Sequence, residues 1–495
     1  MTGLQLLLGV DLGTSGLKAV AVDLRGDVVG QCQVGYPTSR PEPGAAEQDP
    51  SQWLTALASA LADLRSQLPT AQWLSLGLSG MIPTLVTTNA DGEPVGPALT
   101  WEDARAEAQG AALRQAVGSD WLYERTGQWL DGRYLLPMWE RIVEVDPTRA
   151  DNTAWLLGAR DYIYWWLTGV RFTDPSTATG FGCFGLASGE WLADVLAVTA
   201  LRTGRTLPQL PQVRATTQQS PLSPRAAAML DLPVGLPVVL GSADSVSAAL
   251  ALGVTSPGEV AYVAGTSTVI LGVSDHLHVD PSHRYLVTPL ALGDGWGLEM
   301  DLLTTGSALT WLADLFGITA PEIVELGLVV DPMDVPVFLP YLAPGEQGAL
   351  WDPELTGTLS GLGLHHGRAE ISAALVVGLV LESRRCLDVL AEVAGGSGPI
   401  RIAGSSASDL SFQRALASST GRTVTSTSVT EHSARGAAMV AAASLGLVLE
   451  PIAVEELVIS PGDRVPWDLA TVRHNRTLSQ VQSFANAVPS RERER

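Results

Sequence analysis

Residues 6–22 read LLLGVDLGTSGLKAVAV, which is an apolar run, a turn and a second apolar run. Leu6–Val10 has the composition of a buried strand, and Asp11–Gly16 collects the Gly, Thr, Ser and Asp residues that favour tight turns. Lys18–Leu24 places valines at alternate positions, as a strand does. A second turn leads to Val28–Tyr36. The N-terminus therefore predicts three successive strands joined by tight turns.

The same arrangement returns about halfway along the chain. Val260–Val273 reads VAYVAGTSTVILGV, again an apolar strand, a Gly-Thr-Ser turn and a second apolar strand. The two triplets begin at Gly13 and Gly265, 252 positions apart in 495 residues. This period favours two related domains, for which we predict residues 1–243 and 244–495. Chance is the alternative, because short Gly/Thr/Ser turns are common in hairpins.

The intervening elements alternate between helix and strand, which predicts an α/β fold. Asp49-Pro50 has the N-cap and first-turn residues of a helix start. The further predicted elements are a strand at Trp73–Leu78, a hairpin turn at Ala90–Gly92, a strand at Leu236–Leu240 leading into a helix, a long helix at Glu370–Val393, a strand at Ile400–Ala403 and a helix of small residues at Ser433–Leu445.

Composition excludes several classes of protein. The chain is 46% hydrophobic and 17% charged, an ordinary globular balance. Its net charge of −22 argues against a nucleic-acid surface or an anionic membrane, which need clustered cations. Gly436–Leu449, a strongly apolar stretch, is too short to cross a bilayer, and the N-terminus lacks a signal-peptide pattern. We expect a cytoplasmic protein with three reduced, buried cysteines.

The turn DLGTSGLK, Asp11–Lys18, is the first candidate for chemistry. Gly13, Thr14 and Ser15 offer backbone N–H groups and hydroxyls that can surround phosphate oxygens. Asp11 is a candidate Mg²⁺ ligand, and Lys18 would add a mobile positive charge. Lys18 is also the chain's single lysine among 30 cationic side chains. The alternative is a plain hairpin in which Asp11 caps the turn.

Asp244 is the candidate catalytic base. It follows a strand and a run of small residues, and a helix begins just after it. A carboxylate at a helix N-terminus is stabilised in its ionised form and can accept a proton from an attacking hydroxyl. The alternative is that Asp244 only caps the helix.

Three weaker candidates complete the set. Gly265, Thr266 and Ser267 form a possible second phosphate loop, and Gly404–Ala407, with Ser405, would let a purine or ribose approach the backbone. Trp101 would stack on the apolar face of a sugar, and Asp103 would accept hydrogen bonds from hydroxyls. The respective alternatives are an ordinary hairpin, a generic strand-to-helix turn, and a core tryptophan beside a helix-start acid.

Taken in order, these motifs resemble the FGGY family of carbohydrate kinases, and within it the xylulokinase-like branch. The resemblance covers roughly residues 6–445. It rests on DLGTSGLK, EQDPSQW at Glu47–Trp53, LSG at Leu78–Gly80, TWEDAR at Thr100–Arg105, ARDYIYWWLTG at Ala159–Gly169, Asp244, the second Gly-Thr-Ser turn, FLPYLAPGE at Phe338–Glu346 and the Gly404 turn.

The resemblance implies two actin-like, RNase H-type domains with an active-site cleft between them. It also implies ATP-dependent phosphorylation of a sugar or polyol, with D-xylulose giving xylulose 5-phosphate as the leading expectation. The implied roles are Asp244 as base, Asp11 with Mg²⁺, the two Gly-Thr-Ser hairpins on the phosphates, Gly404 and Ser405 beside the adenosine, and Met81, Ile82 and Pro83 with Trp101 and Asp103 at the sugar.

Departures from the family pattern concern mainly the sugar. Met81-Ile82-Pro83-Thr84 stands where xylulokinases show Gln-Met-His-Gly, so a histidine is replaced by Pro83, which has no side-chain hydrogen-bonding group. Gly345-Glu346-Gln347 and Gly404-Ser405-Ser406 depart from Gly-Glu-Arg and Gly-Gly-Gly. The open alternatives are a kinase for ribulose, glycerol or gluconate, and a catalytically impaired sugar- or nucleotide-binding protein. A homodimer is a further expectation.

Overall fold

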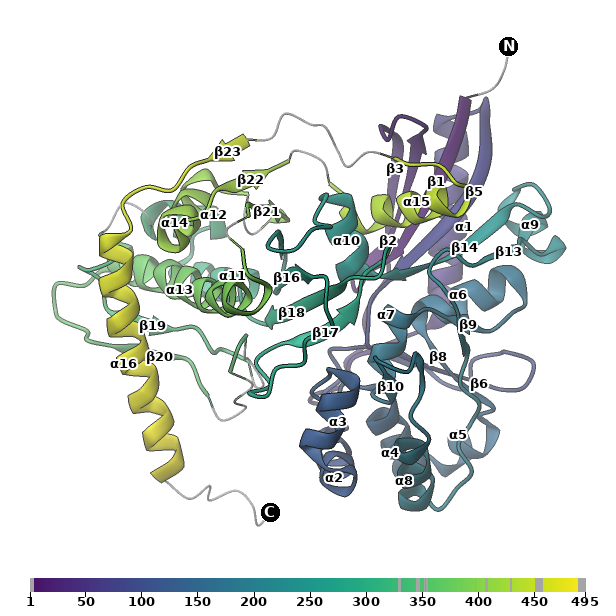
Figure 1. Cartoon of the computed structure of the whole chain (residues 1–495), viewed down its shortest axis with the longest axis horizontal. Helices are drawn as coiled ribbons and strands as arrows, with labels where there is room; N and C mark the ends of the chain where they lie inside the picture. The colour runs from purple at the N-terminus through teal and green to yellow at the C-terminus, as the bar shows by residue number, and fades with distance from the viewer. Residues whose placement is uncertain are drawn as a thin grey trace.

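The chain forms two lobes, each built around one large sheet (Figure 1). The computed structural model describes residues 4–327, 331–343, 348–350, 352, 355–396, 398–405, 408–427, 430–449 and 457–487. The N-terminal sheet has the order β13-β14-β5-β1-β2-β3, and the C-terminal sheet has the order β17-β18-β16-β15-β21-β22-β23. Helices pack around both, so the two-domain α/β fold predicted from the sequence is confirmed.

The N-terminal sheet begins with the predicted strands. β1, β2 and β3 are antiparallel neighbours, and Leu12 lies opposite Leu17 at the first turn. β5 and β14 then add in parallel to β1. Asp49 accepts a hydrogen bond from the Ser51 amide (2.9 Å), which confirms the predicted start of α1. The elements are β1 (Leu4–Leu12), β2 (Gly16–Asp23), β3 (Val28–Gly35), α1 (Pro50–Gln67), β5 (Ala71–Gly80), β13 (Gln219–Pro221) and β14 (Pro237–Ala243).

The C-terminal sheet repeats this plan. β15, β16 and β18 are antiparallel neighbours, and β21 and β22 add in parallel beside β15. The shared order of antiparallel and parallel strands supports a duplication, beyond the two turns alone. The elements are β15 (Val260–Ala264), β16 (Thr268–Ser274), β17 (Leu286–Pro289), β18 (Trp296–Leu302), α13 (Arg368–Ala394), β21 (Ile400–Ala403), α14 (Leu410–Thr420), β22 (Val424–Ser426), β23 (Leu457–Ile459) and α16 (Val465–Ala487).

Helix α15 (His432–Ser444) comes from the C-terminal half of the sequence but lies on the N-terminal sheet (Figure 1). Glycines permit this close approach: a Cβ on Gly9 would lie 1.9 Å from the Ala434 oxygen, and one on Gly77 would lie 2.1 Å from the Ala437 oxygen. The opposite face of α15 packs on α10 (Asp244–Ala251), where a Cβ on Gly436 would meet the Ser247 oxygen at 2.0 Å. The small residues of this helix thus allow its backbone to approach both neighbours closely.

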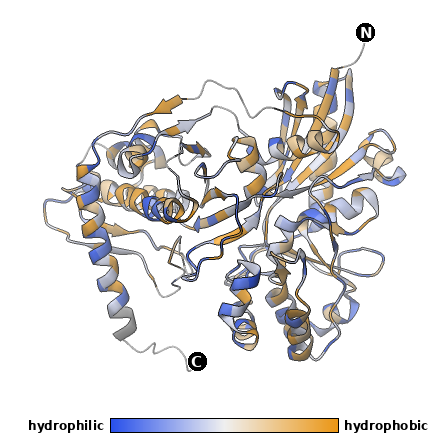
Figure 2. Cartoon of the chain, viewed as in Figure 1, coloured by the Kyte–Doolittle hydropathy of each residue, from blue (hydrophilic) through white to orange (hydrophobic). Residues whose placement is uncertain are grey.

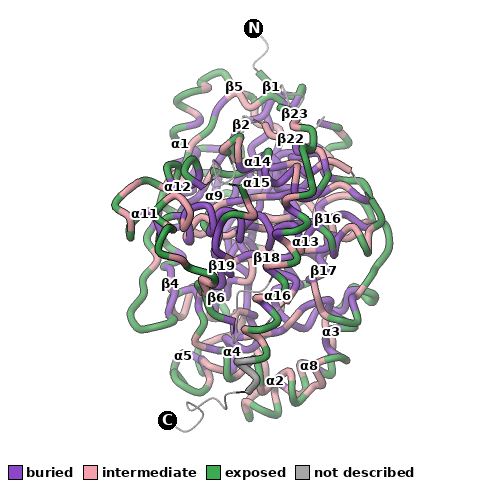
Figure 3. The backbone as a smooth tube through the Cα atoms, turned by 90° about the vertical axis from the view of Figure 1, so that its left-hand side faces the viewer, coloured by how far each residue is buried: buried purple, intermediate pink, exposed green. Residues whose placement is uncertain are grey.

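The hydrophobic core follows from these contacts. Hydrophobic residues run along the central strands (Figure 2), and buried residues gather in the middle of the molecule while exposed ones lie on the outer loops (Figure 3). One buried cluster contains residues of β1 and β2 in the N-terminal sheet, of helices α10 and α15, and of β15 and β16 in the C-terminal sheet. The two lobes therefore share apolar packing through α10 and α15.

Burial of the cysteines was only partly as predicted. Cys183 and Cys386 are buried, whereas Cys32 is partly exposed because it lies on β3, an edge strand of the N-terminal sheet. All three are free thiols. In the described ranges, no helix is both long and apolar enough to cross a membrane.

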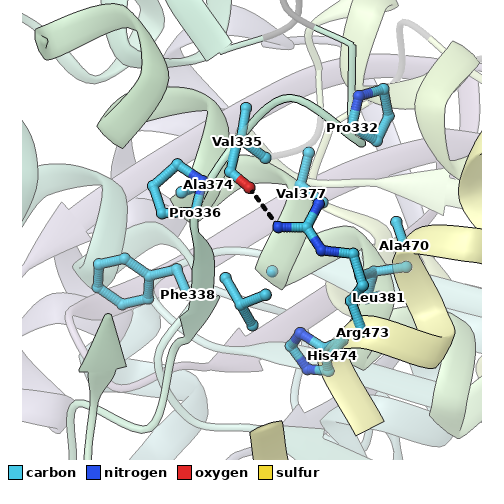
Figure 4. Close-up of a pocket in the computed structure, with 12 residues that line it drawn as sticks. Pro332, Val335, Pro336, Phe338, Ala374, Val377, Leu381, Ala470, Arg473 and His474 are labelled. Atoms are coloured by element: carbon cyan, nitrogen blue, oxygen red, sulfur yellow. Dashed lines mark hydrogen bonds between the residues drawn. The ribbon is translucent and has the colours of Figure 1, made fainter. Parts of the chain in front are cut away.

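A small pocket lies in the C-terminal lobe between α13, α16 and residues 335–338 (Figure 4). Its lining is mostly apolar, and Arg473 on α16 donates to the Val335 carbonyl (2.9 Å) across it. The space in it is about the size of one water molecule. The Arg473 hydrogen bond beside this pocket links α16 to the rest of the C-terminal lobe, well away from α10 (Figure 1).

Candidate active site

Asp244 stands at the end of strand β14, where the lobes meet. Gly241 just before it has a left-handed φ of 76°, and a Cβ there would lie 1.6 Å from the Leu78 oxygen. Only glycine fits, and the strand shifts its register at this point. Asp244 is the first residue of α10, Ala243 is the N-cap, and the Asp244 carboxylate accepts from the Ser245 amide (3.0 Å).

The charges around Asp244 come from both lobes. Contrary to the ionised form expected from the helix start, burial raises the pKa of Asp244 to about 8, and the nearby charges of Asp11 and Asp301 raise it as well. Asp11 belongs to β1 of the N-terminal sheet and Asp301 to β18 of the C-terminal sheet. The pairing of Ala243 with Gly80 on β5 and the hydrogen bond from the Ser245 hydroxyl to Glu299 on β18 place the start of α10 between the two sheets.

Asp11 lies in the middle of the N-terminal sheet, opposite Lys18 on β2 and beside Ser79 on β5. Burial raises its pKa to about 6, and Lys18 opposes that rise. Its Oδ1 atom is buried without a hydrogen-bond partner. An orphaned carboxylate oxygen is a suitable ligand for Mg²⁺, which takes few carboxylates and keeps its own waters. Asp11 is part of the strand and does not cap the turn.

The first hairpin is held by side chains from three separate segments. The Tyr36 hydroxyl donates to the Gly13 carbonyl (2.5 Å), and the Gln48 amide donates to the Thr14 carbonyl (2.7 Å). The indole Nε1 of Trp101 donates to the Thr14 hydroxyl (2.8 Å). These bonds hold the carbonyls of Gly13 and Thr14 and the hydroxyl of Thr14 in place.

The tip and the second strand of this hairpin face different surroundings. Ser15 is exposed at the tip. Lys18 extends to Glu431, directly before α15, and its Nζ lies 3.1 Å from the Glu431 Oε2. Glu431 was not among the residues singled out from the sequence.

The second hairpin is closed by its own backbone. The Gly265 amide donates to the Ser267 carbonyl (2.8 Å), and the exposed Thr266 offers its carbonyl to the Ser307 amide (3.1 Å). Thr268, the first residue of β16, shares a hydrogen bond with Thr305 (2.8 Å).

The Gly404 turn lies against this hairpin. Gly404 has a left-handed φ of 97°, and a Cβ there would lie 2.0 Å from the Ala264 oxygen. The turn therefore approaches the residue before Gly265 as closely as backbone allows. Ser405 is exposed beside it, whereas Ser406, Ala407 and the Gly345–Gln347 motif lie outside the described residues.

The sugar-side residues follow strand β5. Met81 is buried and its amide donates to the Leu12 carbonyl (2.9 Å), which ties this segment to the first hairpin. Ile82 packs against the cluster that contains α10 and α15. The Ile82–Pro83 peptide bond is cis, and Pro83 lies near Gly180. These residues therefore border the same junction as Asp244, with apolar side chains.

Asp103 is occupied by protein partners. It is 1% exposed, accepts from the Ala46 amide (3.0 Å), and forms an ion pair with Arg105 (2.6 Å). Trp101 directs its indole N–H to Thr14 and is only partly buried. Its ring thus reaches from the sugar-side segment to the phosphate hairpin.

Further charged residues at the junction went unnoticed in the sequence. Glu299 on β18 accepts from the Ser245 hydroxyl (2.8 Å), and burial raises its pKa to about 8. Burial also raises the pKa of Asp301 to about 6, an effect that Arg133 opposes. The sequence held one signal that could have found them: Glu299 and Asp301 alternate with apolar residues along the strand 298–302.

Comparisons with known proteins agree with this geometry. Residues 6–251 match the N-terminal domain of the FGGY family of carbohydrate kinases, and residues 260–445 match its C-terminal domain. A gluconokinase of Bacillus licheniformis is 26% identical over 388 residues, 76% of this chain and 74% of the relative. A xylulose kinase of Klebsiella pneumoniae is 28% identical over 374 residues, 75% of this chain and 76% of the relative.

Solved structures extend the similarity to the whole fold. The xylulose kinase of Rhodospirillum rubrum superposes with a TM-score of 0.87 at 27% identity, over 97% of this chain and all of that one. A gluconate kinase of Lactobacillus acidophilus, at 20% identity, shares the fold with a TM-score of 0.88 over 99% of both chains. With both domain models matched in order, the chain belongs to the FGGY family of carbohydrate kinases.

Proposed function

We propose that this protein transfers the γ-phosphoryl group of ATP to a hydroxyl of a sugar or polyol, with D-xylulose, giving xylulose 5-phosphate, as the first substrate to test. The observation that carries the proposal is the position of the helix start at Asp244 between the lobes: β14 pairs with β5 of the N-terminal sheet, and the neighbouring Ser245 hydroxyl donates to Glu299 of the C-terminal sheet (2.8 Å). Phosphoryl transfer depends on positioning and charge stabilisation, which a site between two lobes provides.

Asp244 is the residue to accept the proton of the attacking hydroxyl. The oxygen–hydrogen bond of the sugar breaks toward the Asp244 carboxylate as the oxygen–phosphorus bond forms, and ADP departs with the electrons of the broken bond. The 3.0 Å hydrogen bond from the Ser245 amide holds the carboxylate in orientation. A pKa near the working pH suits a group that must take up and then release a proton.

Asp11 is the residue to hold Mg²⁺, because its buried Oδ1 accepts no hydrogen bond of good geometry from the described residues, although the Ser79 and Lys18 side chains lie near enough to lower its pKa. When bound, Mg²⁺ supplies charge neutralisation for the phosphates and orders them. Gly13, Thr14, Ser15 and Lys18 would contact phosphate oxygens from the N-terminal lobe. Gly265, Thr266 and Ser267 would do so from the C-terminal lobe, with Gly404 and Ser405 along the adenosine.

The sugar-side residues leave the acceptor open. Pro83 and the engaged carboxylate of Asp103 offer few hydrogen bonds to hydroxyls, so another polyol, such as ribulose, glycerol, gluconate or erythritol, is the second candidate. Relatives named gluconokinase, glycerol kinase and erythritol kinase support this breadth. A catalytically impaired binding protein on this fold is the third candidate. Cytoplasmic location and a homodimer stay predictions.

The test is a coupled ADP-release screen over D-xylulose, D-ribulose, glycerol, gluconate, erythritol and pentitols. We expect one acceptor to stimulate ADP release well above basal hydrolysis, and this stimulation to vanish in Asp244→Asn. If no acceptor stimulates ADP release in protein that binds ATP in a thermal-shift assay, the result would contradict the kinase and favour the catalytically impaired binding protein.

A further inference from the structure

The single lysine of the chain is held by a carboxylate from the opposite half of the sequence. Lys18 on β2 and Glu431, 413 positions later, form an ion pair with 3.1 Å between Nζ and Oε2. The lysine side chain is 34% exposed and the glutamate side chain 17% exposed, so the pair is partly shielded from water. An ion pair in such a place is less screened than one on the open surface.

Glu431 adopts a backbone conformation that its side chain does not favour. Its φ is 59°, in the left-handed region, and it is one of three described non-glycine residues with a positive φ. This conformation costs free energy for a glutamate, so the surrounding structure must hold it there. Such residues concentrate at functional sites.

The structure around Glu431 supplies that restraint. Directly after it, α15 is fixed to the N-terminal sheet through the close approach at Gly9. The Ser433 hydroxyl donates to the Asp244 carbonyl (3.1 Å), so the helix start also touches the residue proposed as base. The buried Arg435 donates to the carbonyls of Gly26 (3.0 Å) and Ala251 (3.2 Å). Glu431 therefore has a fixed position relative to the first hairpin and to Asp244.

Lysine needs such a restraint more than arginine does. Its ammonium is a point charge on four flexible bonds, and fixing it costs conformational entropy at the moment of binding. Asp11 lies opposite Lys18 in the sheet and attracts it to the site. His432, whose pKa burial lowers to about 4, is neutral at pH 7, and the guanidinium of Arg435 is engaged by the carbonyls of Gly26 and Ala251. The Lys18 ammonium has three donors, and the Glu431 Oε2 lies 3.1 Å from it without accepting a hydrogen bond of good geometry, so phosphate oxygens can take these donors.

We propose that Glu431 is a positioning residue for nucleotide binding, which holds the Lys18 ammonium beside the first hairpin for the phosphates of ATP. The proposal rests on the proposed function for the identity of the ligand. In an acidic chain, the ammonium of its one lysine would otherwise sample many rotamers. Glu431 orders it in advance, as preorganised binding groups are ordered.

The test is a double-mutant cycle on ATP binding, measured without sugar by isothermal titration calorimetry in the presence of Mg²⁺. We expect Lys18→Met to weaken binding about tenfold and Glu431→Gln to weaken it about three- to tenfold. The double variant should bind no more weakly than Lys18→Met alone, because Glu431 acts only through Lys18. Additive losses, unchanged binding or tighter binding in Glu431→Gln would each overturn the proposal.

Two further variants separate positioning from folding. Glu431→Gly relieves the left-handed strain, so it should keep the melting temperature of the wild type yet weaken ATP binding as Glu431→Gln does. Glu259→Gln removes a similarly shielded carboxylate that pairs with Arg401 (3.8 Å, 22% exposed) and should leave ATP binding unchanged. A loss of binding that follows the melting temperature across these variants would show a merely structural role.

The outcomes also separate this proposal from the proposed function. Normal ATP binding by the wild type that is insensitive to Glu431 overturns the positioning role and leaves the kinase proposal intact. Glu431-dependent ATP binding without phosphorylation of any acceptor supports the positioning role and contradicts the kinase. Failure of the wild type to bind ATP would overturn both.

Discussion

The indole Nε1 of Trp101 lies 2.8 Å from the hydroxyl oxygen of Thr14 and donates a hydrogen bond to it. Trp101 belongs to the segment expected at the sugar, and Thr14 belongs to the hairpin expected at the phosphates. This hydrogen bond therefore links the proposed sugar site to the proposed phosphate site within the N-terminal lobe. An acceptor that packs on the Trp101 ring would also bias the orientation of Thr14.

Trp101→Phe keeps an aromatic face and removes the donor. We expect the KM for ATP to rise about two- to tenfold, the worth of one hydrogen bond, and Thr14→Val to do the same without further loss in the double variant. Steady-state kinetics with the best acceptor measures this. Trp191→Phe, which loses an indole bond to the Pro211 carbonyl (3.1 Å), is the control. Additive effects would contradict the link.

Asp244→Asn removes the proton acceptor with little change of shape. We expect kcat to fall about 10²- to 10⁴-fold while ATP binding persists, because the hydroxyl loses its general base. Asp409→Asn alters another helix-start aspartate, the N-cap of α14, and should cost stability without a comparable loss of kcat. A variant of Asp244 within threefold of the wild type would contradict the assignment.

The stability of the ligand-free protein should fall as pH rises from about 7 to 8.5. Burial raises the pKa of Asp244 and of Glu299 to about 8, so in this interval the folded state holds protons that the unfolded chain has already lost. Below that interval, His432 and His474 act in the opposite direction, because burial lowers their pKa values. The measurement is the melting temperature across this interval.

Two variants test whether the carboxyl groups of Asp244 and Glu299 cause this pH dependence of the melting temperature. Asp244→Asn and Glu299→Gln should each flatten the decline, since neither amide ionises. The same slope in both variants as in the wild type would contradict the assignment.

Gly9→Ala should destabilise the fold severely. The added Cβ would lie 1.9 Å from the Ala434 oxygen, so α15 would have to move off the N-terminal sheet. We expect a loss of several kcal/mol, about 3 or more, in the free energy of unfolding. Gly35→Ala, where the nearest atom is 3.6 Å away, is the matched control and should be nearly neutral. Equal denaturation midpoints for both would contradict the close packing.

Gly404→Ala should disturb the second hairpin. Two costs combine there, a left-handed φ and a Cβ 2.0 Å from the Ala264 oxygen. Gly361→Ala also requires a left-handed φ, 83°, but has no neighbour within 4 Å, so it measures the first cost alone at about 1 kcal/mol. We expect Gly404→Ala to cost clearly more in chemical denaturation and to raise the KM for ATP. Similar costs would contradict the contact with the hairpin.

Much of the site was readable from local pattern, and the rest was not, for a physical reason. Asp11, Thr14 and Asp244 could be singled out because glycine turns and strand ends leave short-range signals in the sequence. Glu431 could not, because its importance depends on Lys18, which lies 413 positions away. Asp103 shows the converse: its side chain looked available, but the fold surrounds it with Arg105 and the Ala46 amide.

By itself, the sequence determined the strand-turn-strand segments, their repetition half a chain apart and the α/β class, because hydrophobic periodicity and turn chemistry act between near neighbours. Only the tertiary structure decided that α15 crosses to the N-terminal sheet, where Gly9 admits its backbone. That crossing brings Glu431 to Lys18 and Ser433 to Asp244. Contacts of this kind depend on how surfaces far apart in the chain fit together, and local propensity carries no information about that fit.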